Sequence, residues 1–520
     1  MLYARPSAET KGPTMRGVLA VILACALSPS GWATTWFVDA EADDGGNGLS
    51  WATAATNLDQ VLPLTEAGDD IWVARGTYRP PIEMNDTGFI VERGVRILGG
   101  FTDDDDVVSD RDPSVNLTWI EGATNSGTAD DPIERGRGFT IVAPVDEPVT
   151  IDGFNIVLCG IIVEDDDAAG GAIHAPDASH VTVIDCEFQS NLARTTSTKT
   201  TSEARGGAIA STGGTLIIDR CTFFFSTTQQ ISAFANQDVG GTGSAIATIG
   251  TDVQILESQF TENGTSGTGL AIPASTLGSG GAVATHDGIL EIIDSSFVKN
   301  RAIDGGAVHA TNTSPLVIEM TDFFDNAASS LGGAINSGNS PLVVRDSLFG
   351  SNDADAHGGA ICGSIQDISS TLFSGNAATF RGGAIATTEG ATIRSCDFIG
   401  NAAYLGGGVS ADVPVTGDPV LLESSRFASN FSFPYDPPIG SENFLGGGGG
   451  LYLRASSFRV TRCQFERNTG SIGGGAWMTT LSPPNGGGIQ ILDNCLFDQN
   501  TALTGGALVL PIAQVTHLTV

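Results

Sequence analysis

Basic and histidine side chains at five positions are of types that could do acid–base chemistry. Arg194, Lys199 and Arg205 stand in a stretch rich in Ser and Thr, where a basic side chain could act as a general base. Clustered basic residues in a polar loop are usually just solvated, and this is the interpretation we favour. His174 and His309 each follow a Gly-Gly-Ala-Ile or Gly-Gly-Ala-Val segment, but several repeats separate them. We therefore expect the two histidines not to act as a pair.

Aromatic residues in the stretch 431–444 form a second candidate site. Phe431, Phe433 and Tyr435 alternate along the chain beside prolines, and Phe444 closes the stretch. Rings held in this way would present a stiff apolar surface with polar edges, which could stack on sugar rings or insert into a partner protein. The alternative is that Phe431, Phe433 and Phe444 pack against their own repeat. We predict these four residues as binding residues and assign no catalytic or metal-ligating residue.

Two acidic runs, 103–106 and 164–167, could attract calcium. A calcium site needs six to eight converging oxygen ligands, which an acidic run alone does not supply. A solvated loop is the simpler interpretation of both runs. Calcium is therefore kept as a possibility, and we expect no other cofactor.

A regular repeat must position all these residues. A Phe-x-x-Asn motif recurs every 24–26 residues in its clearest stretch, and a Gly-Gly-Ala-Ile-like segment follows each copy. A fixed period of this length predicts a solenoid, in which each repeat is one coil stacked on the next. The anchors of this stretch are Phe297, Asn300, Phe323, Asn326, Phe349, Asn352, Phe373, Asn376, Phe398 and Asn401.

Composition and alternation indicate the kind of solenoid. The chain has 68 Gly in 520 residues, and its short apolar runs are rich in β-branched residues and lack the pattern of leucine-rich repeats. Val181 and Val183 share one face, and after a two-residue corner Cys186 and Phe188 share the next inward face. The sequence therefore predicts an all-β fold, a parallel β-helix.

Each anchor then has an expected physical role. The Phe should stack on the Phe of the next coil, about 4.8 Å away. The Asn should stand at a bend with left-handed backbone angles and bond its neighbours as a ladder. The Gly pair should make a turn that a side chain would obstruct. The residue after Gly-Gly-Ala, such as Ile173 or Val308, should point inward.

Most cysteines occupy one position of the repeat. Cys186, Cys221, Cys396, Cys463 and Cys495 each stand two residues before an anchor Phe, where other repeats carry Ser or Thr. This pattern predicts a small inward position and buried free thiols rather than disulfides. The sequence contains no Cys-x-x-Cys pair that would suggest a metal site.

The chain is strongly acidic, with a formal net charge of −35. Nucleic acid and anionic membranes are therefore poor partners, because their charge has the same sign. Surface glycans or proteins are the expected partners, and the sequence leaves the oligomeric state open.

The chain divides into three expected parts. Residues 1–33 have the basic, apolar and small-residue pattern of a secretory signal peptide, and neither their apolar run nor any later segment is long enough to span a membrane. Residues 34–70 are expected to form an N-terminal cap, with a short helix that begins after Ser50. Residues 71–520 are expected to form the β-helix, with regular coils from about residue 170. The final residues read as the opening of another coil, so we expect the sequence to be truncated.

Four insertions interrupt the regular spacing between the Asn and the Gly pair. They follow Asn191, Asn263 and Asn430 and lie near Phe225; the first two span 15 and 17 residues, where regular repeats have five or six. All four leave the same corner of the coil, so they should project from one edge as the only deep relief. Such insertions often form the working face of a solenoid.

The repeat and the N-terminal block resemble those of polymorphic outer-membrane proteins and of secreted bacterial β-helix proteins. The resemblance covers residues 36–520 and implies a right-handed parallel β-helix of the pectin-lyase-like fold, located outside the cell, at the cell surface or in the outer membrane. Besides the repeat, the segments that carry it are 36–39, 45–48, 50–52, 70–78, 98–101 and 111–113.

Proteins of this fold include polysaccharide lyases and hydrolases, so fold alone does not give function. Hydrolases need converging carboxylates, and the sequence shows only the fragments Asp165-Asp166 and His357-Gly358 of the motifs that mark them. We expect a non-catalytic secreted or surface protein, adhesin-like or envelope-associated, that binds through its insertions. The alternative is a polysaccharide-active lyase or hydrolase.

Overall fold

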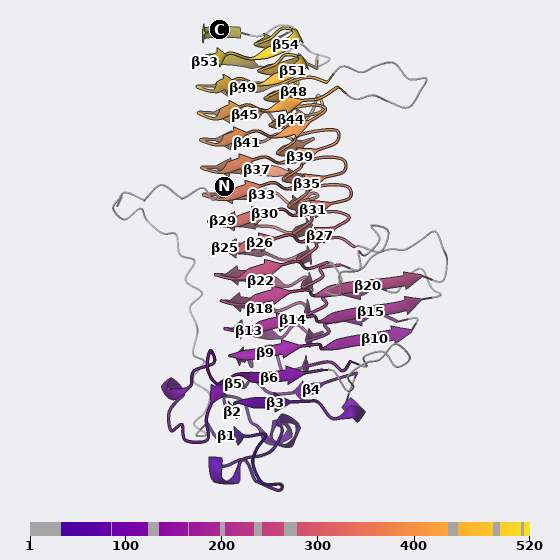
Figure 1. Ribbon diagram of the computed structural model, residues 1–520, viewed down its shortest axis with the longest axis vertical. Coiled ribbons are helices and arrows are strands. Elements are labelled where there is room, and N and C mark those ends of the chain that lie inside the picture. The colour runs from indigo at the N-terminus through magenta and orange to yellow at the C-terminus, as the bar shows by residue number, and fades with distance from the viewer. Residues whose placement is uncertain are drawn as a thin grey trace.

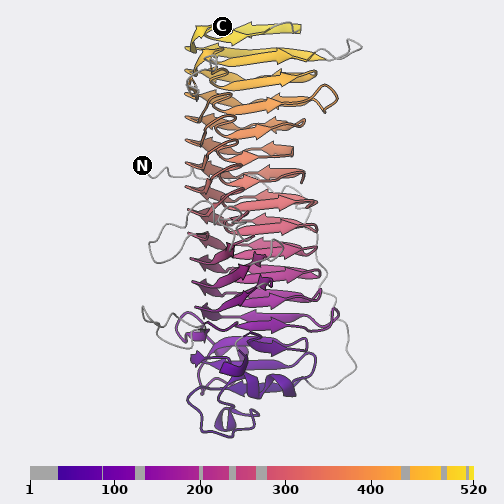
Figure 2. The ribbon, with the colours of Figure 1, turned by 90° about the vertical axis from the view of Figure 1, so that its right-hand side faces the viewer.

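The computed structural model describes residues 33–84, 86–122, 135–164, 166–197, 203–232, 242–264, 278–434, 446–481, 489–510 and 514–519. The chain forms a right-handed parallel β-helix whose coils stack from the N-terminal to the C-terminal end (Figures 1 and 2). The helices in the described ranges are single 3-10 turns, none of which could span a membrane.

One regular coil shows the plan. It comprises β25 (Leu290–Ile293), β26 (Ser296–Val298), β27 (Arg301–Ala302) and β28 (Val308–Thr311). Each strand pairs in parallel and in register with its equivalent in the next coil. The apolar residues of each strand point inward, so a single core runs along the axis of the solenoid.

The first two strands of each coil belong to a 29-stranded sheet that bends between them. Its first row comprises β1 (Thr35–Val38), β2 (Asp70–Ala74), β5 (Arg96–Phe101), β8 (Val149–Asp152), β13 (His180–Ile184), β18 (Thr215–Asp219), β22 (Asp252–Leu256), β25, β29 (Leu316–Glu319), β33 (Leu342–Arg345), β37 (Ile365–Ser369), β41 (Thr392–Arg394), β45 (Val420–Glu423), β49 (Phe458–Thr461), β53 (Gln490–Asp498) and β56 (Gln514–Thr519). Its second row comprises β3 (Gly76–Tyr78), β6 (Thr118–Glu121), β9 (Phe154–Val157), β14 (Glu187–Gln189), β19 (Thr222–Phe224), β23 (Gln259–Thr261), β26, β30 (Asp322–Phe324), β34 (Leu348–Gly350), β38 (Leu372–Ser374), β42 (Asp397–Ile399), β46 (Arg426–Ala428) and β50 (Gln464–Glu466).

Two further sheets complete the coils, and we name them by their first and last strands. The β27–β54 sheet comprises β27, β31 (Ala327–Ala328), β35 (Asp353–Ala354), β39 (Ala377–Ala378), β43 (Ala402–Ala403), β47 (Phe431–Ser432), β51 (Thr469–Ile472) and β54 (Thr501–Thr504). The β4–β55 sheet comprises β4 (Phe89–Val91), β7 (Phe139–Ile141), β12 (Ile173–Ala175), β17 (Ile209–Thr212), β21 (Ile246–Ile249), β24 (Val283–His286), β28, β32 (Ile335–Asn336), β36 (Ile361–Cys362), β40 (Ile385–Thr387), β44 (Val409–Asp412), β48 (Leu451–Ala455), β52 (Ala476–Thr480) and β55 (Leu508–Val509).

The N-terminal end departs from the expected single helix. Three short 3-10 turns take its place: η1 (Trp51–Thr53), η2 (Leu58–Gln60) and η3 (Leu62–Leu64). The helix prediction was wrong because Ala54 is extended and the Ala55 N–H donates to the Phe37 carbonyl, which ends the first turn. Ser50 makes no capping bond. Leu58 and Val61 still face the core, as the apolar spacing predicted.

The predicted Phe stack is confirmed. Adjacent rings lie 4.5–5.0 Å apart between centroids and are within 12° of parallel. In-register pairing of β26, β30, β34 and their equivalents sets this spacing. The stack comprises Phe188, Phe223, Phe260, Phe297, Phe323, Phe349, Phe373, Phe398, Phe427, Phe465 and Phe497.

The Asn ladder is confirmed as well. Asn352 is fully buried, and its Oδ1 accepts both the backbone N–H and the Nδ2–H of Asn326, at 3.1 and 3.0 Å. Its Nδ2 donates to the Phe323 carbonyl and to Asn376 Oδ1, at 3.0 and 2.9 Å. The same pattern links Asn263, Asn300, Asn326, Asn352, Asn376, Asn401, Asn430, Asn468 and Asn500.

The left-handed backbone conformation lies one residue earlier than expected. Lys299, Asp325 and Ser351 have φ of 57°, 53° and 54°, whereas the Asn that follows each of them does not have a positive φ. The prediction for the Asn backbone was wrong because the inward-pointing amide, not the Asn backbone, defines this corner. The residue before it takes the turn and points outward.

The two residues of the Gly pair are glycine for different physical reasons. Gly305 has φ +64°, the left-handed region that favours glycine. A Cβ on Gly306 would lie 2.1 Å from the Gly333 carbonyl oxygen of the next coil. The first Gly therefore serves the turn, and the second serves close stacking. The residues after Gly-Gly-Ala, including Ile173 and Val308, are fully buried as predicted.

The position that carries the cysteines lies at the bend of the large sheet, and its small side chains form hydrogen bonds there. Cys186, Cys221, Cys396, Cys463 and Cys495 are buried free thiols, as predicted. Ser258 in the same position accepts the Cys221 backbone N–H at 3.0 Å and donates to the Leu256 carbonyl at 2.6 Å. Ser and Cys can therefore replace each other at this position, because each is small and can donate to the equivalent backbone carbonyl.

Truncation of one stacked ring tests the core. We expect Phe349→Ala to lower the free energy of unfolding by about 3–5 kcal/mol, because it leaves a cavity between two rings that cannot close up. Phe324→Ala, at an outward and half-buried position of β30, is the matched control and should cost far less. Equal losses in denaturant unfolding would contradict the role of the stack.

Replacement of one ladder residue tests the Asn corner. Asn352→Leu removes the acceptor of two buried N–H groups of Asn326, so we expect a loss of about 1–3 kcal/mol of unfolding free energy. Asn155→Leu, on the outward face of β9, is the control and should change stability little. Thermal and denaturant unfolding of both variants would be compared. An unfolding free energy of Asn352→Leu equal to that of the native chain would contradict a stabilising role of the ladder.

Candidate functional site

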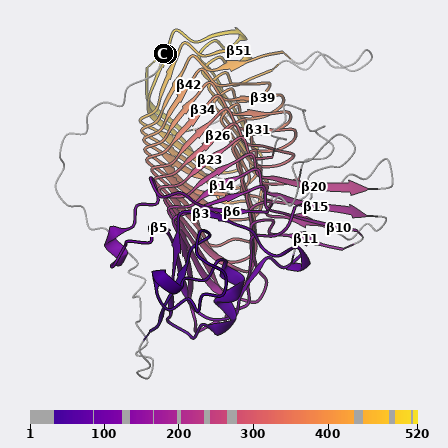
Figure 3. The same ribbon diagram turned by 60° about the horizontal axis from the view of Figure 1, so that its bottom comes forward.

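A three-stranded parallel sheet projects from the solenoid at the corner after β9, β14 and β19. It comprises β10 (Gly160–Glu164), β15 (Leu192–Ser197) and β20 (Thr227–Ser232), and Figures 1 and 3 show it extending away from the coils. The pair β11 (Ala168–Ala169) and β16 (Ala204–Arg205) lies beside it. We call these five strands the lateral sheet.

The lateral sheet is built from insertions that the sequence placed at this corner. β15 begins directly after Asn191, and β20 begins two residues after Phe225. Three successive long coils let the inserted strands pair with one another, since each extends in the same register. A small apolar cluster of Ile161, Ala168, Ala193 and Ala204 holds the sheet together.

A basic cluster lies where the lateral sheet meets the β4–β55 sheet. Arg137 is 7% exposed, and its Nη1 donates to His174 Nδ1 at 2.8 Å while its Nη2 donates to the Ala169 carbonyl at 2.9 Å. Arg205 lies near His174 and forms a 3.4 Å ion pair with Asp167. The cluster thus joins residues from β11, β12 and β16 and from the segment before β7.

The electrostatics of this cluster fix its protonation. Burial lowers the pKa of Arg137 to about 10, so the guanidinium stays charged at neutral pH. Burial, together with Arg137 and Arg205, lowers the pKa of His174 to about 4. His174 is therefore neutral, and its Nδ1 must be the acceptor because a guanidinium can only donate. Among the described residues, no carboxylate lies in hydrogen-bond contact with Arg137.

A groove of about 320 Å³ continues from this cluster along the outer face of the β4–β55 sheet. Arg205 and Glu203 line one end, and His286 and His309 line the coils beyond. Its floor is formed by small side chains such as Ala247 and Ala284, because the outward positions of these coils carry Ala. The groove could receive an extended polar ligand, with the Arg205 guanidinium and the Glu203 carboxylate at one end.

The predicted basic and histidine residues have different outcomes. Arg205 and His174 belong to the basic cluster, whereas Arg194 is half-buried on β15 and Lys199 lies outside the described residues. His174 and His309 share one register position four coils apart, as expected of residues that do not act as a pair.

The sequence reasoning missed Arg137. Pairing of Phe139 with Ile173 places Arg137 level with Gly171, the second residue of a Gly pair. A bulky charged residue at a position that is glycine in the next coil was the signal available in the sequence.

The predicted aromatic site is partly described. Phe431 on β47 is 42% exposed, and its ring centroid lies 6.3 Å from that of the half-buried Phe433. Tyr435 and Phe444 lie outside the described residues. Most equivalent positions of the neighbouring coils are small, such as Ala377 and Ala402, so Phe431 stands out from its sheet.

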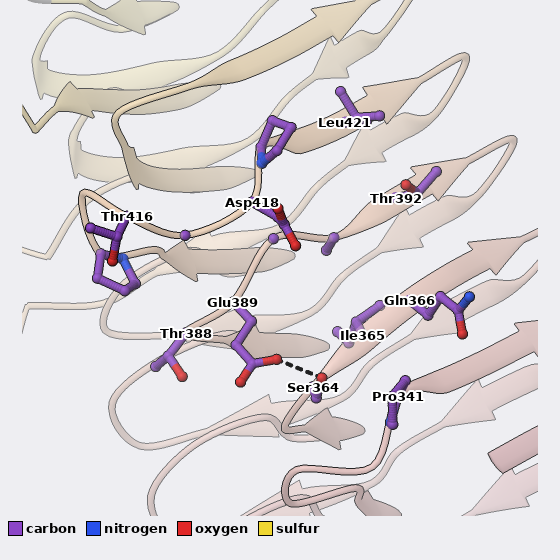
Figure 4. Close-up of a pocket in the computed structure, with 15 residues that line it drawn as sticks. Pro341, Ser364, Ile365, Gln366, Thr388, Glu389, Thr392, Thr416, Asp418 and Leu421 are labelled. Carbon is purple, nitrogen blue, oxygen red and sulfur yellow. Dashed lines mark hydrogen bonds between the residues drawn. The ribbon is translucent and has the colours of Figure 1, made fainter. Parts of the chain in front are cut away.

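A second groove shows that the insertions are not the only relief, so that expectation was wrong. A groove of about 660 Å³ lies at another corner, between the β4–β55 sheet and the first row of the large sheet (Figure 4). It exists because the loop 413–419 is longer than the equivalent loop of neighbouring coils. Glu389 in this groove accepts a hydrogen bond from Ser364 at 2.6 Å, and Asp418 comes from the loop beyond.

The described acidic side chains of the two runs have other partners or lie apart from one another. Within the part of the chain that the structure describes, no group of three or more His, Cys, Asp or Glu side chains is arranged to hold a metal ion. Asp105 accepts the Thr102 backbone N–H, and Asp167 pairs with Arg205. Asp165 lies outside the described residues.

Comparison with known proteins gives likeness of fold alone. No protein-family model and no curated protein matches the sequence. Among solved structures, the chain is similar to a rhamnogalacturonan lyase (12% identity, 71% of this chain and 82% of that one, TM-score 0.34). It is also similar to the A-module of the Azotobacter vinelandii mannuronan C-5 epimerase AlgE6 (10% identity, 87% of this chain and 90% of that one, TM-score 0.35). A third similar structure is PfbA, a surface adhesin of Streptococcus pneumoniae (10% identity, 78% of this chain and 82% of that one, TM-score 0.33).

Acid titration tests the half-buried His174. Its pKa is about 4 in the folded chain and about 6.5 when exposed. The contribution of the neutral imidazole to the free energy of unfolding is therefore retained above pH 6.5 and lost as pH falls toward 4. His174→Gln keeps an acceptor for Arg137 but cannot be protonated. Between pH 7 and pH 4, we expect the unfolding free energy of this variant to fall by about 2–3 kcal/mol less than that of the native chain. Identical pH dependence of unfolding in both proteins would contradict this account.

Proposed function

We propose that this chain is a non-catalytic secreted or cell-surface protein that binds a glycan or protein through the edge from which its insertions leave. The observation that carries the proposal is the exposed Phe431 ring beside Phe433, on a sheet that otherwise carries mostly small or polar residues at this position. An exposed aromatic ring is costly to keep in water and is a recurrent means of holding sugar rings or partner side chains.

The scaffold supports such a role. Coils held by the Phe stack and the Asn ladder keep the edge straight, so residues from distant parts of the sequence are presented in fixed order. The net charge of −35 favours solubility of a long sheet-rich surface and disfavours nucleic acid.

Substitution of the exposed aromatics tests the proposal. We expect Phe431→Ala and Phe433→Ala to weaken binding to cells or to a glycan array by about tenfold or more, since each ring supplies stacking area. Met320→Ala is the matched control because Met320 is 43% exposed at a different corner. Binding that survives both Phe substitutions would show that this edge is structural.

A polysaccharide-active enzyme is the second candidate. The observation that favours it is the basic cluster of Arg137, His174 and Arg205 beside an open groove, where a lyase would need a cationic group. A screen of uronate and neutral polysaccharides for new reducing ends or unsaturated products separates the two candidates. Product formation that disappears in Arg205→Met would replace the first proposal with the second.

A further inference from the structure

A patch of charged and aromatic side chains lies on the outer face of the β4–β55 sheet, near its C-terminal end. Along β48, Leu451 and Leu453 point into the core, so Tyr452 and Arg454 point outward. In-register pairing sets Arg454 beside Asp412 of β44 and Tyr452 beside Trp477 of β52. We call Arg381, Asp412, Tyr452, Arg454 and Trp477 the outer patch.

The charged part of the outer patch is two guanidiniums around one carboxylate. Asp412 Oδ2 accepts from Arg454 Nη2 at 2.8 Å and from Arg381 Nη1 at 2.7 Å, and Asp412 Oδ1 accepts from Arg454 Nε. Asp412 is nearly buried, whereas the side chains of Arg381 and Arg454 are 35% and 45% exposed. Asp412 therefore holds both guanidiniums in place and leaves Arg454 Nη1 and Arg381 Nη2 for another acceptor.

The charge balance of this group is unusual for the chain. Two cations and one anion leave a local charge of +1, in a protein whose net charge is −35. Asp412 neutralises only one of the two guanidiniums. An incoming anionic group could bond the remaining N–H donors with charge-assisted hydrogen bonds, which are stronger than neutral ones.

The aromatic part of the outer patch adjoins these donors. Tyr452 and Trp477 meet edge to face, with ring centroids 5.2 Å apart and planes at 68°. The indole ring covers the backbone at Gly447, where a Cβ would lie 2.1 Å from the ring. Trp477 is only partly buried, so it presents apolar surface on β52, the strand next to the one that carries Arg454.

We propose that the outer patch binds a glycan residue that carries a single carboxylate, such as a terminal sialic or uronic acid. The carboxylate would accept from Arg454 and Arg381, and the apolar face of the sugar would lie on Trp477. A polyanionic chain is disfavoured because the long-range field of an acidic protein repels it, while one carboxylate is held by the local charge. This inference rests on the proposed function, and it names a ligand class for a second surface, on a different sheet from the one that carries Phe431.

Affinity measurements with matched oligosaccharides test the inference. The probes are lactose, lactose capped with sialic acid, lactose capped with glucuronic acid, and polygalacturonate, each titrated calorimetrically against the full chain. We expect at least one acid-capped probe to bind about tenfold or more tightly than lactose. Polygalacturonate should bind more weakly than that probe per binding site. The two capped probes tell a sialic acid from a uronic acid.

Variants assign the binding to the outer patch. Arg454→Met and Trp477→Ala should each reduce the affinity for the acid-capped probe about tenfold or more. Arg394→Met is the matched control, because Arg394 is 51% exposed and pairs with Asp367 on a different sheet. If Arg454→Met lowers the melting temperature strongly, Arg381→Met replaces it, since the Arg454–Asp412 pair then stays intact.

Two results would overturn the inference. Equal affinity for lactose and both capped probes would remove the role of the carboxylate, and tighter binding of polygalacturonate would remove the preference for a single charge. If the outer-patch variants bind normally while Phe431→Ala abolishes binding, the proposed function stands and this inference fails. If no glycan or cell surface binds the native chain, the proposed function itself fails.

Discussion

The parallel, in-register backbone pairing between coils is the constraint on which the rest of this structure depends. It sets each side chain directly above its equivalent in the next coil, about 4.8 Å away. Any residue type that can stack on itself at that spacing is then stabilised along the whole solenoid. The Phe rings at 4.5–5.0 Å and the Asn amides bonded at about 3 Å are the two series that meet this condition in the core. The second Gly of each pair meets it by having no side chain at all.

The same constraint determines where variation is tolerated. Inward positions repeat because a different size would strain two neighbouring coils, while the outer face and the corners are free to change. Three consecutive long coils at one corner form the lateral sheet, and a single long loop at another corner forms a groove. Chemistry on this molecule is therefore confined to corners and outward rows. Residues there come close only when they lie on adjacent coils or share an edge.

Charge is distributed in the same way. Most acidic residues face outward and keep a long sheet-rich surface soluble, and many arginines pair with one of them. Two groups of arginines depart from this pattern. Arg137 is buried beside a neutral His174, and Arg454 and Arg381 share Asp412. Both places lie on the outer face of the β4–β55 sheet, several coils apart. At these two places, the outer face of an acidic solenoid carries fixed positive groups beside small or aromatic side chains, so an anionic ligand would be attracted there.

The sequence by itself determined the solenoid, the Phe stack, the Asn ladder, the inward position after each Gly pair and the buried thiols. It could do so because each is a local pattern repeated at a fixed period, and a period maps directly onto register. It did not determine the 3-10 form of the N-terminal turns, or which residue takes the left-handed angle, because these depend on individual backbone bonds such as Ala55 to Phe37. The basic cluster and the outer patch were decided only by the tertiary structure. Arg137 and Arg205, or Asp412 and Arg454, lie tens of residues apart, and only stacking in register brings them together.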